Sequence, residues 1–110
     1  MEEMIEKLWG FEVILVSTPL YAAKEIHLVE GAQCSLHYHK VKDETFIVME
    51  GEVTIELEDE VHHLTTDDSL HIKPYQKHRF YATTPTAMML EVSTEDMMED
   101  SYREEDSCYR

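Results

Sequence analysis

The chain has 110 residues and a formal net charge of −15, from 24 acidic and 9 basic side chains. A charge of this sign repels polyanions, which argues against nucleic acid and anionic membranes as partners. No run approaches the roughly 20 apolar residues of a membrane-spanning helix, and the start is acidic rather than signal-like, so we expect one cytoplasmic domain over 1–110.

The first predicted element is a short helix over 2–9, where the apolar side chains follow the i, i+3, i+4 spacing of an amphipathic helix. After Gly10 the pattern changes to short runs in which apolar and polar residues alternate, which is typical of strands with one buried face. The predicted strands are 11–17, 21–29, 34–40, 45–50, 52–58, 61–65, 69–73, 78–83 and 88–93.

Turn-like residues separate these runs, with no long helical segment between them. This arrangement favours an all-β, antiparallel sandwich or barrel. Toward the C-terminus, 95–106 carries seven acidic residues among twelve, and charge alone predicts a solvated or frayed tail. Neither Cys34 nor Cys108 belongs to a CxxC pair, and an intracellular setting would keep both reduced.

The segment from Gly31 to Gly51 holds the clearest chemical pattern. Residues i and i+2 of a strand point to the same face, so His37 and His39 can chelate one divalent ion. Glu44 opens the next strand, where its carboxylate can return to the same ion and leave other positions open for water or substrate. A surface hairpin with two solvent-facing histidines is the alternative, and these residues alone leave both interpretations open.

The spacing of this segment resembles the first cupin motif at every fixed position: Gly31, His37, His39, Glu44 and Gly51. The later segment DDSLHIKPYQKHRF resembles the second cupin motif and places His78 as a further ligand. The resemblance implies a small antiparallel jelly-roll barrel that holds one divalent metal ion through His37, His39, Glu44 and His78. Zn, Mn, Fe, Co and Ni all suit such donors.

The second motif departs from the family pattern. Asp67 and Tyr75 stand where the family usually has glycine, and Lys73 replaces a proline. Aspartate tolerates a left-handed backbone at modest cost, whereas tyrosine does so less readily. We therefore expect another turn geometry before His78, with Tyr75 a candidate to intrude on the mouth of the barrel.

A narrower resemblance covers nearly the whole chain. The fragments SLHYHKVKDE, HRF, LEVST and DSYREEDSCYR are similar to the C-terminal isomerase domain of bifunctional mannose-1-phosphate guanylyltransferase/mannose-6-phosphate isomerases. The resemblance implies a metal-dependent aldose–ketose isomerase of a sugar or sugar phosphate, and a homodimer. It also implies that the acidic segment from about 95 to 110 packs on the domain or on a partner subunit. A sugar-binding cupin without catalysis and a non-haem iron dioxygenase stay open as alternatives.

Isomerisation moves a hydrogen between C1 and C2 of a sugar and needs a base over those carbons. Glu91, in the apolar run 88–93, is our candidate base, although strand parity equally allows it to face solvent. His71 and Tyr81 are further candidates for the base.

The basic residues suggest an anionic substrate. Five of the nine lysines and arginines fall in the two motif segments: Lys40, Lys42, Lys73, Lys77 and Arg79. Arg79 is our candidate for contacting a phosphate or sugar acid, because the guanidinium fork suits bidentate contacts with oxygen. As the strand neighbour of His78, however, it is expected to point to the opposite face. Loop solubility is the alternative reason for the clustering.

Overall fold

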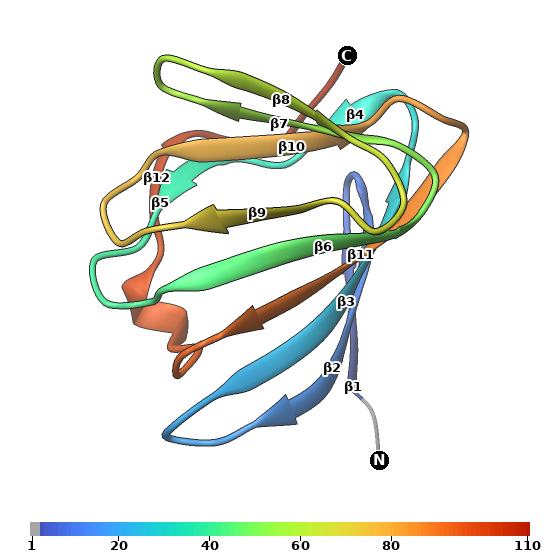
Figure 1. The fold of residues 1–110 in the computed structure, drawn as a ribbon. Coiled ribbons are helices and arrows are strands. Elements are labelled where there is room, and N and C mark those ends of the chain that lie inside the picture. Colours follow the sequence, from blue (N-terminus) through green and yellow to red (C-terminus); the bar gives the residue numbers. More distant parts are fainter. Residues whose placement is uncertain (1–2) are drawn as a thin grey trace.

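The computed structural model describes residues 3–110, which form two facing antiparallel sheets (Figure 1). The larger sheet has six strands in the order β1 (Glu3–Lys7), β2 (Gly10–Ser17), β3 (Ala22–Val29), β11 (Thr86–Ser93), β6 (Glu44–Glu50) and β9 (Ser69–Ile72). The smaller sheet has five in the order β12 (Tyr102–Glu105), β5 (Leu36–Tyr38), β10 (His78–Ala82), β7 (Val53–Leu57) and β8 (Val61–Leu64). A separate pair joins β13 (Cys108–Tyr109) to β4 (Ala32–Gln33).

All nine predicted runs contain a strand, but the predicted N-terminal helix is wrong. Its described part, from Glu3 onward, forms β1, which pairs with β2 in a tight hairpin whose last paired residues are Lys7 and Gly10. An isolated helix of eight residues is marginal in water, whereas β2 offers a complete ladder of hydrogen-bond partners. Within residues 3–110 the only helical element is the 3-10 turn η1 (Met98–Asp100).

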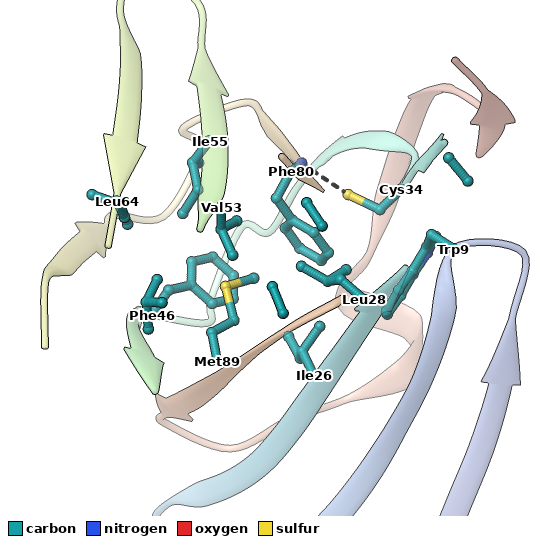
Figure 2. Packing of buried hydrophobic residues seen from close by; sticks show 14 of the residues in the cluster. Trp9, Ile26, Leu28, Cys34, Phe46, Val53, Ile55, Leu64, Phe80 and Met89 are labelled. Atoms are coloured by element: carbon teal, nitrogen blue, oxygen red, sulfur yellow. Dashed lines mark hydrogen bonds between the residues drawn. The ribbon is translucent and has the colours of Figure 1, made fainter. Parts of the chain in front are cut away.

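The hydrophobic core lies between the inward faces of the two sheets (Figure 2). Phe46 and Met89 from the larger sheet are fully buried, and Phe80 from the smaller sheet packs edge-on against Trp9 and Phe46 at ring distances of 5.4 and 5.5 Å. Burying a side chain of this size contributes about 1.5–3 kcal/mol. The core thus holds the sheets together and anchors the strands that carry the candidate ligands.

Glycines at both ends of the first motif meet backbone requirements. Gly31 and Gly51 adopt φ angles of 102° and 73°. At Gly51 a Cβ would also lie 2.5 Å from the carbonyl oxygen of Thr86, so a side chain would force the backbone apart. These positions explain why the motif begins and ends on glycine.

The acidic C-terminal segment is not a frayed tail. β12 pairs with β5, and β13 pairs with β4, while the last residue, Arg110, donates its backbone N–H to the carbonyl of Gly31 at 2.7 Å. The segment therefore packs on its own domain, beside the first motif. None of the residues from 3 to 110 forms a helix long and apolar enough to cross a membrane.

The two cysteines are free and differ in environment: Cys34 is buried and Cys108 is exposed. Burial raises the pKa of the Cys34 thiol to about 12. Because the thiolate is the nucleophile, we expect iodoacetamide at mildly alkaline pH to alkylate Cys108 and to leave Cys34 unmodified in the folded protein. Peptide mass spectrometry measures both sites. Equal labelling of the two cysteines without denaturant would contradict the buried position of Cys34.

Candidate metal centre

Three histidines converge between the two sheets. His37 on β5 pairs directly with His78 on β10, and His39 follows two residues after His37. One ring nitrogen from each lies within 4.8 Å of the other two, which is close enough for all three to bind one metal ion. His78 is fully buried and His39 is 7% exposed. The structure thus brings together three of the four predicted ligands as a group that could hold a metal.

In each of the three histidine rings, Nδ1 is the nitrogen that contacts a backbone carbonyl. The Nδ1 atoms of His37, His39 and His78 lie 2.8, 2.7 and 2.9 Å from the backbone carbonyls of Ser35, Asp100 and Gln76. A carbonyl can only accept, so Nδ1 carries the proton in each neutral ring and Nε2 keeps its lone pair. Metal-binding histidines are oriented by outer contacts of this kind.

Glu44, the fourth predicted ligand, lies against two of these rings. Its Oε2 is 3.3 Å from Nε2 of His39, and its Oε1 is 3.5 Å from Nε2 of His78. Within the described chain, neither carboxylate oxygen makes a hydrogen bond, and neither does Nε2 of His78, although all three atoms are buried. Buried polar atoms without hydrogen bonds are costly. A divalent cation would satisfy them, so these residues fit a metal ion.

The protonation states also suit metal binding. Burial lowers the pKa of His37 to about 3, with the neighbouring His78 adding to the effect, and burial together with Lys42 lowers the pKa of His39. Burial acts to raise the pKa of Glu44, but contacts with His78 and Lys42 outweigh it and hold that pKa at about 2. Neutral imidazoles and an ionised carboxylate are the forms that bind metal.

Both motif positions that lack the usual glycine keep a left-handed backbone, so the prediction of a different turn geometry is wrong. Asp67 has φ 75° and Tyr75 has φ 69°. The backbone N–H of Tyr75 donates to the carbonyl of His39 at 2.6 Å, and its ring stacks on Tyr38 at 6.3 Å. The Tyr75 side chain is 64% exposed and does not line the cavity beside the histidines. The second motif thus retains its turn and directs His78 inward.

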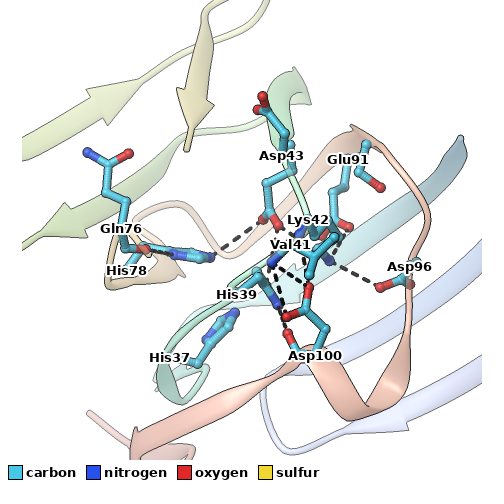
Figure 3. A network of polar contacts seen from close by, with 12 residues as sticks. His37, His39, Val41, Lys42, Asp43, Gln76, His78, Glu91, Asp96 and Asp100 are labelled. Carbon is cyan, nitrogen blue, oxygen red and sulfur yellow. Dashed lines mark hydrogen bonds and ion pairs between the residues drawn. The ribbon is translucent and has the colours of Figure 1, made fainter. Parts of the chain in front are cut away.

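A cavity of about 620 Å³ opens beside the histidines, and Glu91 lines it together with His37 and His39. Glu91 is 5% exposed. Its Oε2 lies 3.0 Å from Nζ of Lys42, which is itself 3.3 Å from Oε2 of Glu44. Lys42 therefore bridges the candidate base and a candidate ligand. Figure 3 shows Lys42 beside Glu91 and Asp96. Burial, reinforced by the charge of Glu44, raises the pKa of Glu91 to about 7 despite Lys42 and Lys24.

The other proposed bases lie elsewhere. His71 is exposed and pairs with Asp43, and the hydroxyl of Tyr81 donates to Glu56 at 3.2 Å. Neither residue lines the cavity. Of the three candidates for the base, only Glu91 lines the cavity with His37 and His39, whereas His78 and Glu44 lie behind these two rings and do not line it.

The structure does not bring Arg79 to the cavity. Its guanidinium pairs with Glu56 at 2.7 Å and with Glu105 at 2.8 Å, on the outer side of β10. Arg103 lines the cavity instead. It stands opposite His37 in the ladder between β12 and β5, and cross-strand partners project to the same face.

Of the five basic residues in the motif segments, only Lys42 lines the cavity. Lys77 pairs with Glu58 and Glu104 outside, and Lys40 lies over the ring of Tyr102. The basic residues that cluster in the sequence therefore do not cluster in space at the candidate site. The cavity instead contains mixed charge, with Lys24 and Lys42 both paired to carboxylates.

Sequence reasoning missed the residues that the N- and C-terminal segments bring to the site. Lys24 pairs with Glu12 on the neighbouring strand at 3.2 Å, and Asp96 pairs with Lys42 at 3.2 Å. The lysine at position 24 offered one signal, because it interrupts the inward face of a strand that is otherwise apolar. Nothing local marks Asp96, which is one of many acidic residues in its segment.

The protein-family model described as "Cupin domain" matches residues 24–94, about two thirds of the chain. The chain therefore belongs to the cupin domain family. The matched range contains the four candidate ligands and Glu91. A comparison with curated proteins finds no match.

Solved structures share the all-β cupin fold at low sequence identity. KdgF from Halomonas sp. is 20% identical with a TM-score of 0.80, and the match covers 88% of this chain and 89% of KdgF. Oxalate decarboxylase from Bacillus subtilis is 17% identical with a TM-score of 0.83, covering 94% of this chain and 30% of the enzyme. The capsular polysaccharide assembling protein CapF from Staphylococcus aureus is 19% identical with a TM-score of 0.81, covering 96% and 34%. This chain thus spans about a third of the latter two proteins.

Proposed function

We propose that this protein is a metal-dependent aldose–ketose isomerase that acts on a sugar or sugar phosphate, similar to mannose-6-phosphate isomerase. The observation that carries the proposal is the position of Glu91, a buried carboxylate that lines one cavity with His37 and His39. A cavity of about 620 Å³ is large enough for a monosaccharide, since small-molecule sites typically measure about 300–1,000 Å³.

In this proposal His37, His39, Glu44 and His78 hold one divalent ion, with Zn, Mn, Fe, Co and Ni all suited to the donors. When bound, such an ion supplies Lewis acidity toward the carbonyl and hydroxyl oxygens of the sugar. Glu44 is then occupied. Of the other carboxylates that line the cavity, Glu91 is our candidate to accept a proton, because it is buried and its pKa is raised.

Glu91 takes the proton from one sugar carbon and returns it to the neighbouring carbon, while the hydroxyl proton passes between the two oxygens on those carbons, so that the carbonyl and the hydroxyl exchange places. Its raised pKa of about 7 suits a base that must both accept and release a proton near neutral pH. Lys42, 3.0 Å away, holds the carboxylate in place and balances its charge. Arg103 takes over the contact to an anionic group that the sequence assigned to Arg79, because only Arg103 of the two lines the cavity.

The proposed activity is tested by incubating metal-loaded protein with mannose 6-phosphate, fructose 6-phosphate and a panel of free pentoses and hexoses. NMR spectroscopy of the sugars is expected to show interconversion of an aldose and its ketose. No interconversion with any of these sugars, across several metals, would contradict the isomerase. Saccharide-induced thermal shifts without turnover would favour a sugar-binding cupin, and oxygen uptake would favour an iron dioxygenase. The homodimer and the cytoplasmic location stay predictions.

A further inference from the structure

The three candidate histidine ligands differ in the origin of their orienting contacts. His37 and His78 each lie against the carbonyl of the residue two positions earlier, Ser35 and Gln76. His39 instead donates to the carbonyl of Asp100, which lies 61 residues later in the chain, at the end of η1. The first two rings are therefore held by their own local backbone, whereas the orientation of His39 depends on the C-terminal segment.

The carboxylate of Asp100 makes a second set of contacts beside this one. Its Oδ1 accepts the backbone N–H of Lys40 at 2.8 Å, and its Oδ2 accepts that of Lys42 at 2.9 Å. The N–H of Val41, between them, points at both oxygens, at 3.2 and 3.1 Å (Figure 3). Asp100 is only 4% exposed, so water competes little for these bonds. Hydrogen bonds to an ionised acceptor are about twice as strong as neutral ones.

These three N–H groups belong to the connection that links two candidate ligands. Residues 40–42 begin directly after His39 and lead through Asp43 to Glu44. Removing the Asp100 carboxylate would take away the acceptor that these three backbone N–H groups share. The same connection carries Lys42, whose ammonium group is held from the C-terminal segment by Asp96 at 3.2 Å.

We propose that Asp100 is a positioning residue of the metal centre. Through its carbonyl it sets the ring of His39, and through its carboxylate it sets the course of the chain from His39 to Glu44. The inference rests on the metal centre of the proposed function. It gives the acidic C-terminal segment a role in metal affinity that goes beyond covering the edge of β5.

The test compares Asp100→Asn with Glu99→Gln in the full-length protein. Asparagine keeps the size of the side chain and the backbone carbonyl, but it turns one acceptor oxygen into an amide group that opposes the backbone N–H groups. Glu99 is the exposed neighbour in the same turn and loses the same charge. Affinities for Zn²⁺ and Mn²⁺ are measured by competition with a chromophoric chelator. We expect Asp100→Asn to weaken binding at least about tenfold, as for other residues that orient metal ligands, and Glu99→Gln to bind as the wild type does.

A second measurement separates positioning from general stability. Nitrogen NMR of the histidine rings in the metal-free protein reports which ring nitrogen carries the proton. We expect His39 to be protonated on Nδ1 in the wild type. In Asp100→Asn we expect a mixture of tautomers, because disturbing the contacts of the carboxylate with residues 40–42 shifts the backbone carbonyl of residue 100 relative to the ring. His37 and His78 should stay unchanged, because their acceptors are local. A merely structural role for Asp100 would not alter His39 selectively.

Several results would overturn the proposal. Wild-type metal affinity in Asp100→Asn would do so, as would an unchanged His39 tautomer in that variant. If the variant does not fold, the spectrum of the wild type still tests the proposal. A His39 ring protonated on Nε2 in the wild type would exclude the hydrogen bond from its Nδ1 to the carbonyl of Asp100. Failure of the proposed function is distinguishable, because it is measured as absence of sugar interconversion by the wild type, which leaves the effect of Asp100→Asn on metal affinity and on the His39 tautomer unchanged. If the wild type binds no metal at all, the tautomer of His39 still reports the contact with Asp100.

Discussion

Replacing His78 with alanine is expected to weaken the binding of divalent metal by more than about 100-fold, because loss of residues that merely orient a ligand already costs 10–100-fold. His78 is fully buried, and its Nε2 lies 3.5 Å from Oε1 of Glu44 without forming a hydrogen bond. Alanine removes this nitrogen from beside Oε1 of Glu44, while His39 and Lys42 stay near Oε2. Isothermal titration calorimetry with Zn²⁺ and Mn²⁺, together with elemental analysis of protein purified without chelator, measures the loss.

His63→Ala is the matched control, since His63 contacts Thr54 at 2.8 Å and lies outside the histidine group. The same comparison has a thermal readout. A ligand present at 1,000 times its Kd stabilises the folded state by about 4 kcal/mol, so metal should raise the Tm of the wild type and of His63→Ala markedly. The Tm of His78→Ala should respond little. Full metal occupancy in His78→Ala would remove the basis for the proposed centre.

The second large effect is expected at Glu91. Glu91→Gln should lower kcat by about 10²–10⁴-fold, the usual contribution of a general base, while metal affinity stays close to that of the wild type. Glutamine preserves the shape of the side chain but cannot accept the proton. Steady-state kinetics with the sugar identified in the panel, and metal titration of the same variant, measure both quantities.

The pH profile gives an independent check on Glu91. The base must be ionised to act, and burial raises its pKa from 4.5 to about 7. Activity should therefore fall as the pH drops through about 7, rather than through the usual range of a glutamate. Glu25→Gln on the outer face of β3, where Glu25 pairs with His27 at 2.9 Å, should leave kcat and the profile unchanged. A Glu91→Gln variant with wild-type turnover would exclude Glu91 as the base.

The candidate ligands could be predicted because their spacing and the geometry of a strand act over short distances. Alternation places His37 and His39 on one face, and the motif spacing adds Glu44 from the next strand. The same parity argument anticipated that Arg79 turns away from the face of His78, as its ion pairs with Glu56 and Glu105 show. For Arg79, strand parity thus predicted the direction of the side chain correctly, whereas the clustering of basic residues in the sequence wrongly suggested a contact with the substrate.

Short segments were harder to interpret because two patterns fit them equally well. The apolar residues between Met4 and Trp9 satisfy a helical spacing, yet the hairpin pairs Glu3–Lys7 with β2. At Tyr75, propensity argued against a left-handed backbone, but the N–H contact with His39 and the stacking on Tyr38 accompany that conformation. In both cases tertiary contacts outweighed a local preference that is worth little by itself.

Alternation and motif spacing are local properties of the chain, so the antiparallel β architecture and the four candidate ligands could be predicted from the residues alone. That Glu91 faces the cavity follows from the packing of the sheets, since strand parity allowed either face. The tertiary structure also decided that Arg103 rather than Arg79 lines that cavity, and that Asp100 holds His39 from 61 residues away. Contacts between distant segments depend on how the two sheets pack against each other, and this packing cannot be predicted from any short stretch of the sequence.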